Sequence, residues 1–123
     1  MKEITRAAHA LSDETRLRIL NLLMEHECCV CEVMQALDIS QTRASRNLKI
    51  LFDAGFLKMR NDGLFTLYSL DGIGRNFHGD FLSAVKKGLE GNISIKTDIQ
   101  RLHESKRIAP RCSKGKGVTC RTC

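Results

Sequence analysis

Apolar residues recur at helical spacing through most of this chain, and this pattern predicts its elements in order. In residues 2–11 the apolar side chains share one face, which predicts a short first helix with Ile4, Ala7, Ala8 and Leu11 on that face. Ser12 is the expected N-cap of a second helix, because Asp13 and Glu14 follow it in the first turn. That second helix turns three apolar side chains inward, namely Ile19, Leu20 and Leu23.

Two further helices are predicted, separated by a tight turn. The third ends at Asp38 and has apolar residues at i, i+3, i+4 and i+7, which are Val30, Val33, Met34 and Leu37. The fourth is capped by Ser40 and ends at Gly55, a residue typical of helix C-termini. Its expected apolar side is formed by Ala44, Leu48, Leu51 and Phe52, and its opposite side by Thr42, Ser45, Arg46 and Lys49. One face is therefore apolar, and the other is basic with small hydroxyl groups.

Two β-like runs follow, FLKMR and LFTLYSL, with the turn signal Asn61-Asp62-Gly63 between them. A helix over residues 74–90 comes next, with Phe77, Phe81 and Val85 on one face, and then a short helix that holds Ile95, Ile99 and Leu102. After Pro110 the periodicity ends, and a flexible tail is expected. Two short helices joined by a tight turn and followed by a hairpin are typical of a winged helix-turn-helix. The predicted fold class is therefore mainly α with a β-hairpin wing (α+β), organised as a winged helix-turn-helix domain over residues 1–91 and a C-terminal helix with a basic, Cys-containing tail over residues 92–123.

Composition narrows the possible partners. The chain has 123 residues, enough for one small domain, and a formal net charge of +6. A basic surface favours polyanions, with nucleic acid first and anionic membrane second. No apolar run approaches the length of a membrane span, and the N-terminus has no apolar core of a secretory signal, so we expect a cytoplasmic protein with no membrane partner.

The six cysteines fall into two groups: Cys28, Cys29 and Cys31, and then Cys112, Cys120 and Cys123 in the tail. In a reducing cytoplasm such groups are more often metal or redox sites than disulfides. Thiolates select soft ions such as As(III), Sb(III), Cd(II), Pb(II) or Cu(I). Residues i and i+2 on a helix lie about 200° apart, so Cys29 and Cys31 cannot converge on one ion while that turn stays helical, and binding through them must unwind or shift the start of the third helix. Cys28 and Cys31, at i and i+3, can then face one side.

The tail cysteines are ambiguous. Cys120-x-x-Cys123 has the spacing of a metal-binding pair, but one such pair is a weak signal. Basic neighbours favour the reactive thiolate form. Incidental cysteines in a disordered terminus are an equally good interpretation.

Several stretches resemble the ArsR/SmtB family of bacterial repressors: ALSDETRLRILNLL, CVCEVMQALDISQTRASRNLKILFDAGFL and the hairpin, together roughly residues 7–90. Cys29-Val30-Cys31-Glu32 is similar to the ligand motif of the arsenic- and cadmium-responsive branches. The resemblance implies a homodimer formed by the first helix and the helix after the wing, with As(III) or Sb(III) as inducer, Cd(II) or Pb(II) as alternatives, and no organic cofactor. As(III) binding in this family implies three sulfur ligands, and Cys28, Cys112, Cys120 and Cys123 are the candidates for the third.

The chain also departs from the family patterns. The arsenic branch commonly has a further cysteine three residues after the pair, where this chain has Met34. The family's zinc pattern needs Asp-x-His after the wing, but here Asp80 is followed by Phe81 and Leu82. The zinc site is therefore not expected. The N-terminal cysteines of the cadmium branch are also missing.

A reading helix in the major groove needs small, hydrogen-bonding side chains near its N-terminus. We expect contacts to double-stranded operator DNA from the fourth helix and the wing, through Gln41, Thr42, Arg43, Ser45, Arg46, Lys49, Arg60 and Asn61. The alternative is an ordinary solvated basic face.

Enzyme functions are disfavoured, because the chain lacks a GxxxxGK phosphate loop, a Cys-x5-Arg loop and a protease-type His-Glu spacing. Three hypotheses remain: a metalloid-responsive repressor, a thiol-redox or reactive-sulfur repressor of the same fold, and a metal-carrying protein-interaction module.

Overall fold

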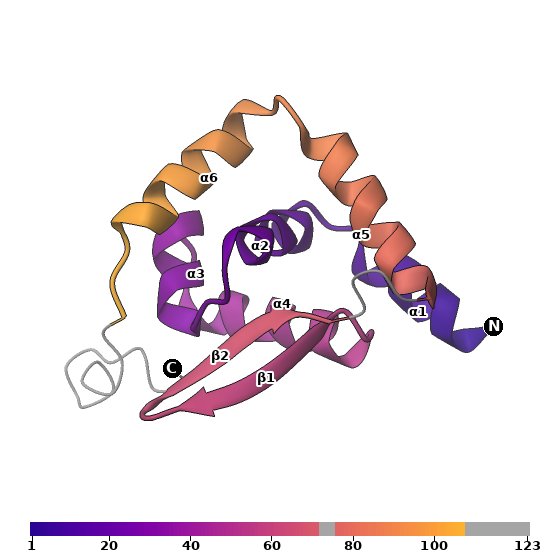
Figure 1. Cartoon of the computed structure of the whole chain (residues 1–123), viewed down its shortest axis with the longest axis horizontal. Coiled ribbons are helices and arrows are strands. Elements are labelled where there is room, and N and C mark those ends of the chain that lie inside the picture. Colours follow the sequence, from indigo (N-terminus) through magenta and orange to yellow (C-terminus); the bar gives the residue numbers. More distant parts are fainter. Residues whose placement is uncertain (72–75, 108–123) are drawn as a thin grey trace.

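The computed structural model describes residues 1–71 and 76–107. In these ranges the chain forms six helices and one hairpin, in the order α1 (Lys2–Ala10), α2 (Glu14–Glu25), α3 (Val30–Leu37), α4 (Gln41–Asp53), β1 (Leu57–Asp62), β2 (Phe65–Leu70), α5 (Asn76–Leu89) and α6 (Ile93–Glu104) (Figure 1). This order confirms the predicted mainly α fold with a hairpin wing. The predicted tail after Pro110 lies outside the described residues.

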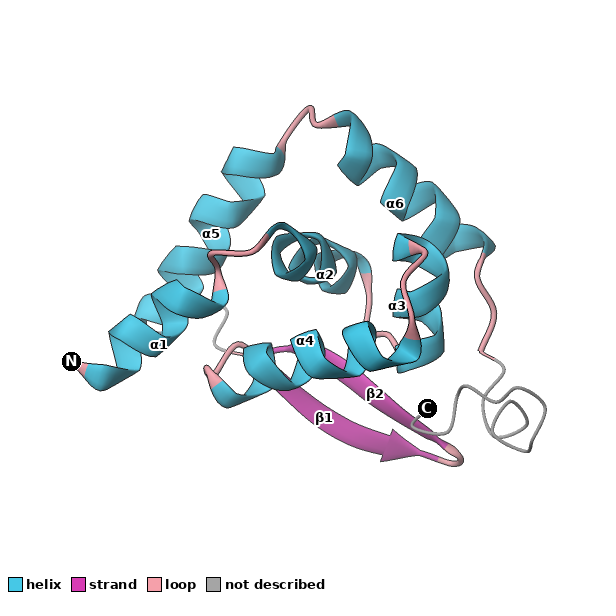
Figure 2. Ribbon diagram, turned by 180° about the vertical axis from the view of Figure 1, so that it is seen from behind, coloured by secondary structure: helices cyan, strands magenta, loops and turns pink. Residues whose placement is uncertain are grey.

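Helix α2 is the centre of the molecule. Figures 1 and 2 show α3, α4, α5, α6 and the hairpin arranged around it. Its inward side chains are almost completely buried, and they join a core made mainly of aliphatic residues, the largest of which are Phe56, Ile19, Leu20, Leu22, Leu48, Leu51 and Leu67. This core holds the helix-turn-helix and the wing in one unit.

The start of α2 differs from the prediction by one residue. Asp13, not Ser12, is the N-cap, and its carboxylate accepts a hydrogen bond from the Arg16 backbone N–H at 3.1 Å. The Ser12 hydroxyl instead donates to the His9 carbonyl at 2.7 Å, at the C-terminal end of α1. Both residue types can cap a helix, and here the short α1–α2 connection uses one for each helix end.

The turn between α3 and α4 is tight because its residues adopt the required backbone conformations. Asp38 ends α3 with a left-handed φ of 56°, and the Ser40 hydroxyl caps α4 by accepting from the Arg43 N–H at 3.1 Å. Helix α4 ends at Asp53 with Ala54 as its C-cap, and the predicted stop, Gly55, follows directly, with φ +94° and a position where a Cβ would lie only 2.6 Å from His78 Nε2. The apolar side of α4 is confirmed for Ala44, Leu48 and Leu51, whereas Phe52 is 37% exposed and does not belong to the core.

The wing is a two-stranded antiparallel sheet in which Leu57 pairs with Leu70 and Asp62 with Phe65. The reversal therefore consists of Gly63 and Leu64, one residue later than the predicted Asn61-Asp62-Gly63 turn. Gly63 adopts the positive φ of 65° that this tight connection needs, so Asn61 and Asp62 remain in the strand. An isolated antiparallel bridge from Cys28 to Tyr68 adds the segment before α3 to the edge of the sheet.

Helices α5 and α6 form an outer layer around α2 (Figure 2). In α5, Leu82 and Gly79 are buried and Phe77 and Phe81 are half-buried. Helix α6 packs against α3 and α2. None of the helices in the described ranges combines the length and apolar character needed to cross a bilayer.

Candidate nucleic-acid interface and cysteine site

Helix α4 presents a basic face to solvent near its N-terminus. Thr42, Arg43, Arg46 and Lys49 are exposed, and Gln41 is half-buried. Arg43 donates to the Thr15 hydroxyl at 3.2 Å, and Lys49 pairs with Asp53 at 3.3 Å. This face therefore has the small and basic side chains that base and phosphate contacts require.

Ser45 differs from the other predicted contact residues on α4. Its hydroxyl is buried and has no hydrogen-bond partner among the described residues. As the helix stands, this oxygen points into the protein, and a contact from Ser45 to a base would need a different side-chain rotamer.

A buried arginine that the sequence analysis did not single out orients α4. The Arg16 guanidinium on α2 donates to the Ala10 carbonyl at 2.7 Å, to Asn47 Oδ1 at 3.0 Å and to the His9 carbonyl at 3.4 Å. Asn47 on α4 in turn donates to the Arg43 carbonyl at 2.9 Å. One side chain thus connects the end of α1 to α2 and α4. A buried guanidinium with several acceptors holds these elements in a defined orientation.

On the wing, Arg60 and Asn61 are both exposed in β1. Arg60 forms a two-point ion pair with Glu27, with Nε to Oε2 at 3.0 Å. The hydrogen bond from Arg60 holds the pKa of Glu27 below its usual range. Asn61 accepts from the Thr66 hydroxyl at 3.4 Å. Arg60 therefore links the wing to the loop that precedes the cysteines.

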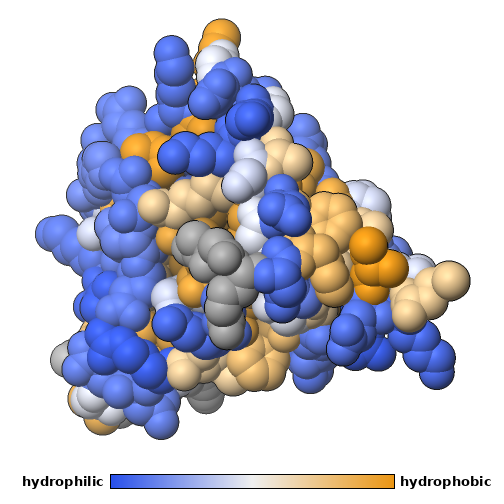
Figure 3. Space-filling model, turned by 45° about the vertical axis from the view of Figure 1, so that its right-hand side comes forward, coloured by the Kyte–Doolittle hydropathy of each residue, from blue (hydrophilic) through white to orange (hydrophobic). Residues whose placement is uncertain are grey.

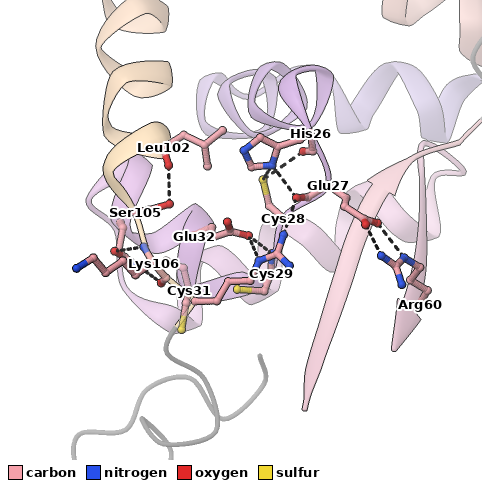
Figure 4. Close-up of polar contacts among 12 residues, drawn as sticks. His26, Glu27, Cys28, Cys29, Cys31, Glu32, Arg60, Leu102, Ser105 and Lys106 are labelled. Carbon is pink, nitrogen blue, oxygen red and sulfur yellow. Dashed lines mark hydrogen bonds and ion pairs between the residues drawn. The ribbon is translucent and has the colours of Figure 1, made fainter. Parts of the chain in front are cut away.

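Cys28, Cys29 and Cys31 are all buried at the junction of this loop with α3 (Figure 4). Cys28 exchanges backbone hydrogen bonds with Tyr68 at 3.0 and 2.8 Å, and its thiol donates to the His26 carbonyl at 3.4 Å. Cys31 is in the first turn of α3 and is disulfide-bonded, so ligand binding through Cys31 requires the reduced protein. Cys112, Cys120 and Cys123 lie outside the described residues.

Cys29 is the N-cap of α3. Its sulfur accepts from the N–H of Glu32, and the Glu32 carboxylate accepts from the Cys29 N–H at 2.9 Å, which completes a capping box. The backbone of Cys29 is extended, with φ −93° and ψ 172°. The helical geometry predicted for Cys28 and Cys29 is therefore wrong, because α3 begins only at Val30. In particular, the expectation that Cys28 and Cys31 face one side is wrong for this conformation.

The three sulfurs do not form a ready ion site. In Figure 4 the Cys28 sulfur lies beside His26, whereas the Cys31 sulfur points away from it. Within the described ranges, no three His, Cys, Asp or Glu side chains are grouped closely enough to hold a metal ion. A soft ion held by all three of these cysteines would therefore require their sulfurs to move together.

The environment of Cys28 favours the neutral thiol. Burial raises the pKa of Cys28 well above its ordinary value, and the neighbouring Glu32 carboxylate raises it further, while Arg107 acts in the opposite direction. A buried thiol without a bound ion is therefore protonated at neutral pH.

The comparisons with known proteins agree with this fold and its motifs. A family model of bacterial regulatory proteins of the ArsR family matches residues 13–59. The chain is 48% identical to the arsenical resistance operon repressor of Escherichia coli over 61 residues, which are 49% of this chain and 52% of that protein. It is 39% identical to a cadmium resistance regulatory protein CadC homolog of Staphylococcus aureus over 70 residues, 56% of this chain and 58% of that protein. The chain thus spans little more than half the length of these two relatives.

A third relative is covered more fully. The arsenical resistance operon repressor of Staphylococcus aureus is 36% identical over 70 residues, which are 57% of this chain and 67% of that protein. Among solved structures, a homodimeric winged helix-turn-helix DNA-binding domain from Mycobacterium bovis, a possible ArsR-family transcriptional regulator, aligns with a TM-score of 0.64 and 26% identity, covering 75% of this chain and 82% of that one. The transcriptional repressor BigR from Xylella fastidiosa shares the fold, with a TM-score of 0.60 at 24% identity over 70% of this chain and 82% of that one. On this agreement of motif order, fold and sequence, the chain belongs to the ArsR family of bacterial regulatory proteins.

Proposed function

We propose that this protein is a transcriptional repressor that binds operator DNA as a homodimer and releases it when As(III) or Sb(III) binds Cys29 and Cys31. The observation that carries the proposal is the position of Cys29. It is the N-cap of α3, the first helix of the helix-turn-helix, so its sulfur cannot leave the cap without disturbing the DNA-binding unit.

Operator binding is supported by the exposed basic face of α4. Arg46 is free to reach a guanine edge or a phosphate, and Arg43 and Lys49 are placed for phosphates. Thr42 and Gln41 supply short polar groups near the helix N-terminus. Counterion release at phosphates would make the affinity fall steeply with rising salt concentration.

The choice of inducer rests on thiolate chemistry and on the relatives. Thiolates prefer soft ions, and two of the relatives are named arsenical resistance operon repressors. A cadmium resistance regulatory homolog is a further relative, which keeps Cd(II) and Pb(II) as alternatives.

The energetics of release follow from the capping box. Losing an N-cap costs about 0.5–2 kcal/mol, and release over two decades of affinity needs a coupling free energy of roughly 3 kcal/mol. Thiolate bonds to a soft ion can supply this difference if they form only when the first turn of α3 opens. The ion shifts the equilibrium by its differential affinity for the two forms.

The third sulfur ligand is Cys28 or a tail cysteine. Cys28 adjoins Cys29 but is held by its backbone pair with Tyr68. Cys112 follows Arg107 by five residues, a distance of at most about 18 Å in extended chain, and Arg107 itself contacts Glu32. Both routes are open to test by substitution.

The test is DNA-binding anisotropy of the fully reduced protein during titration with arsenite. Cys29→Ser and Cys31→Ser are expected to bind operator with wild-type affinity and to stay bound at arsenite concentrations that release the wild type. Because a serine at position 29 is a good N-cap, the Cys29→Ser variant should keep the capped, ion-free form of α3. Cys28→Ser and Cys112→Ser test the third ligand: the variant that no longer releases operator DNA in arsenite lacks that ligand. If Cys29→Ser and Cys31→Ser both release DNA at the wild-type arsenite concentration, the proposed site is wrong.

One observation favours a second candidate. Cys31 is disulfide-bonded in this structure, which is compatible with a repressor that responds to thiol oxidation. The same titration separates the two, because a redox sensor keeps its operator when arsenite is added under full reduction. Failure of the wild type to bind any operator would instead support the metal-carrying interaction module.

A further inference from the structure

The segment after α6 is fastened to the start of α3 by two sets of contacts. Arg107 Nε donates to Glu32 Oε1 at 3.0 Å, and a second guanidinium nitrogen donates to the Glu27 carbonyl at 3.3 Å. One turn along α3, the Gln35 amide exchanges hydrogen bonds with the Lys106 backbone, at 2.8 Å to its carbonyl and 3.1 Å from its N–H. We call these contacts of Glu32 and Gln35 with residues 106–107 the C-terminal clasp.

The clasp acts on the same groups that cap α3. The Glu32 oxygen that accepts from Arg107 also accepts from the Cys29 N–H at 2.9 Å. The Gln35 amide nitrogen that donates to Lys106 also donates to the Cys31 carbonyl at 3.0 Å. The clasp thus contacts the capping box at Cys29 and the backbone at Cys31 together.

The middle of α6 is anchored independently. Asp98 is buried, and both its oxygens accept from Arg18 on α2 at 2.8 Å. Leu102 is also buried, one turn before the clasp. Because α6 is fixed to α2, residues 106 and 107 at its C-terminal end are held beside α3.

We propose that Arg107 and Gln35 are positioning residues that set the ion concentration at which the repressor responds, by holding the first turn of α3 in its capped form. This inference rests on the proposed function. In this proposal, an ion that binds through Cys29 and Cys31 opens the capping box, so that Glu32 gives up the Cys29 N–H. Every contact that keeps Glu32 and Gln35 in place raises the ion concentration needed for release.

The ion pair of Glu32 with Arg107 is partly shielded from solvent, so its loss should have a measurable effect. The Glu32 side chain is 9% exposed and that of Arg107 is 32% exposed. Loss of an ion pair whose side chains are buried to this extent is expected to shift the equilibrium for opening the first turn of α3 by about three- to tenfold. If opening precedes ion binding, amide exchange in the first turn and ion affinity both scale with the same opening constant, so they change by the same factor.

The experiment compares three variants of the full-length reduced protein: Arg107→Ala, Gln35→Ala and Lys106→Ala. Lys106→Ala is the matched control, because it removes a positive charge next to Arg107 while the clasp uses only the backbone of this residue. Gln35→Ala weakens the clasp without changing charge. Hydrogen exchange is measured for residues 29–33 without ion, and the arsenite concentration at half-release of operator is measured by anisotropy.

We expect Arg107→Ala and Gln35→Ala to speed exchange and to lower the half-release concentration by a common factor of about three to ten, with Lys106→Ala near wild type. Arg107→Lys, which keeps the charge and one donor, should restore part of the difference. If Arg107→Ala and Lys106→Ala shift the half-release concentration equally, the effect comes from the loss of one positive charge and not from the clasp, and the proposal is overturned. Faster exchange with an unchanged half-release concentration would also overturn it, although ion-driven release would stand. If the wild type itself keeps its operator in arsenite, the proposed function fails first, and the proposal fails with it.

Discussion

At the scale of single residues, Arg46 and Asn47 are sequence neighbours with opposite surroundings. Arg46 is exposed on the basic face of α4, whereas Asn47 is buried and accepts from the Arg16 guanidinium. Arg46→Ala should lower operator affinity by about 1–3 kcal/mol if it contacts a base, with stability changed by less than about 0.5 kcal/mol. Anisotropy with operator and urea unfolding measure the two quantities. Full operator affinity in Arg46→Ala would remove this residue from the contact surface.

Asn47→Ala should behave in the opposite way. It leaves a buried Arg16 donor without its acceptor, which costs about 1–3 kcal/mol of stability. Operator affinity should fall as well, because the same hydrogen bond fixes α4 against α2. The urea midpoint and the anisotropy titration of the same preparations test this pair, and an Asn47→Ala variant as stable as the wild type would show that Arg16 orients α4 without Asn47.

The predictions from sequence were weakest at individual caps. Asp13 and Ser12 are both good caps, and only the path of the chain between α1 and α2 decides which helix each one serves. Cys29 is not among the residues preferred at N-caps, so its pairing with Glu32 could not be expected from propensity. The partners of the Arg16 guanidinium come from two other helices, α1 and α4, and a helix-face pattern contains no information about such contacts.

At the scale of elements, the loop before α3 is bound to the wing as well as to the helix. Glu27 pairs with Arg60 on β1, and Cys28 pairs with the backbone of Tyr68 on β2. A rearrangement of this loop therefore reaches both elements that we propose to contact DNA, α4 through α3 and the wing through these two contacts.

The protonated state of Cys28 predicts a different pH dependence for different ions. A divalent cation such as Cd(II) displaces one proton from each thiol that it binds, so its apparent affinity should rise by up to about tenfold per pH unit for each such thiol. Arsenous acid forms each As–S bond with loss of one hydroxide, which takes up the thiol proton and leaves as water. Its affinity should therefore be nearly constant between about pH 6.5 and 8.5.

Calorimetry in buffers of different ionisation enthalpy counts these protons directly. With Cd(II), Cys28→Ser should release one proton fewer than the wild type if Cys28 is a ligand, and the same number if a tail cysteine is used. Proton release that is absent for Cd(II) in the wild type would show that the ligand thiols are already ionised, contrary to the burial of Cys28.

Periodicity predicted the elements better than it predicted their partners. The helix order, the Gly55 stop and the apolar positions of α6 follow from spacing that each segment carries by itself. The ion pair of Arg18 with Asp98 joins residues 80 positions apart, and the clasp spans a similar separation, so neither leaves a local signal. The hairpin turn was displaced by one residue because Asn61, Asp62 and Gly63 allow more than one register, and cross-strand pairing selects among them.

At the scale of the whole molecule, α1 and the start of α5 lie side by side at one end (Figures 1 and 2). Figure 3 shows this side of the molecule, where apolar surface lies among polar side chains. Ile4 is 45% exposed, Ala8 is exposed, and Phe77 and Phe81 are half-buried. An apolar surface on two flanking helices is suited to a second copy of the chain, and a structural relative from Mycobacterium bovis is a homodimer.

Substitution of one exposed isoleucine tests whether this surface forms the dimer. In Ile4→Glu an unpaired carboxylate would be buried between the subunits, and we expect the dimer dissociation constant to rise by at least about tenfold. Ile93→Glu is the matched control, because Ile93 is 78% exposed on α6, away from α1. Sedimentation velocity at micromolar concentration should show a monomer for Ile4→Glu and a dimer for Ile93→Glu. Operator affinity should fall only in Ile4→Glu, since two half-sites must be held by one dimer. A wild type that sediments as a monomer while binding operator normally would refute the dimer itself, and an Ile4→Glu dimer as tight as the wild type would place the interface elsewhere.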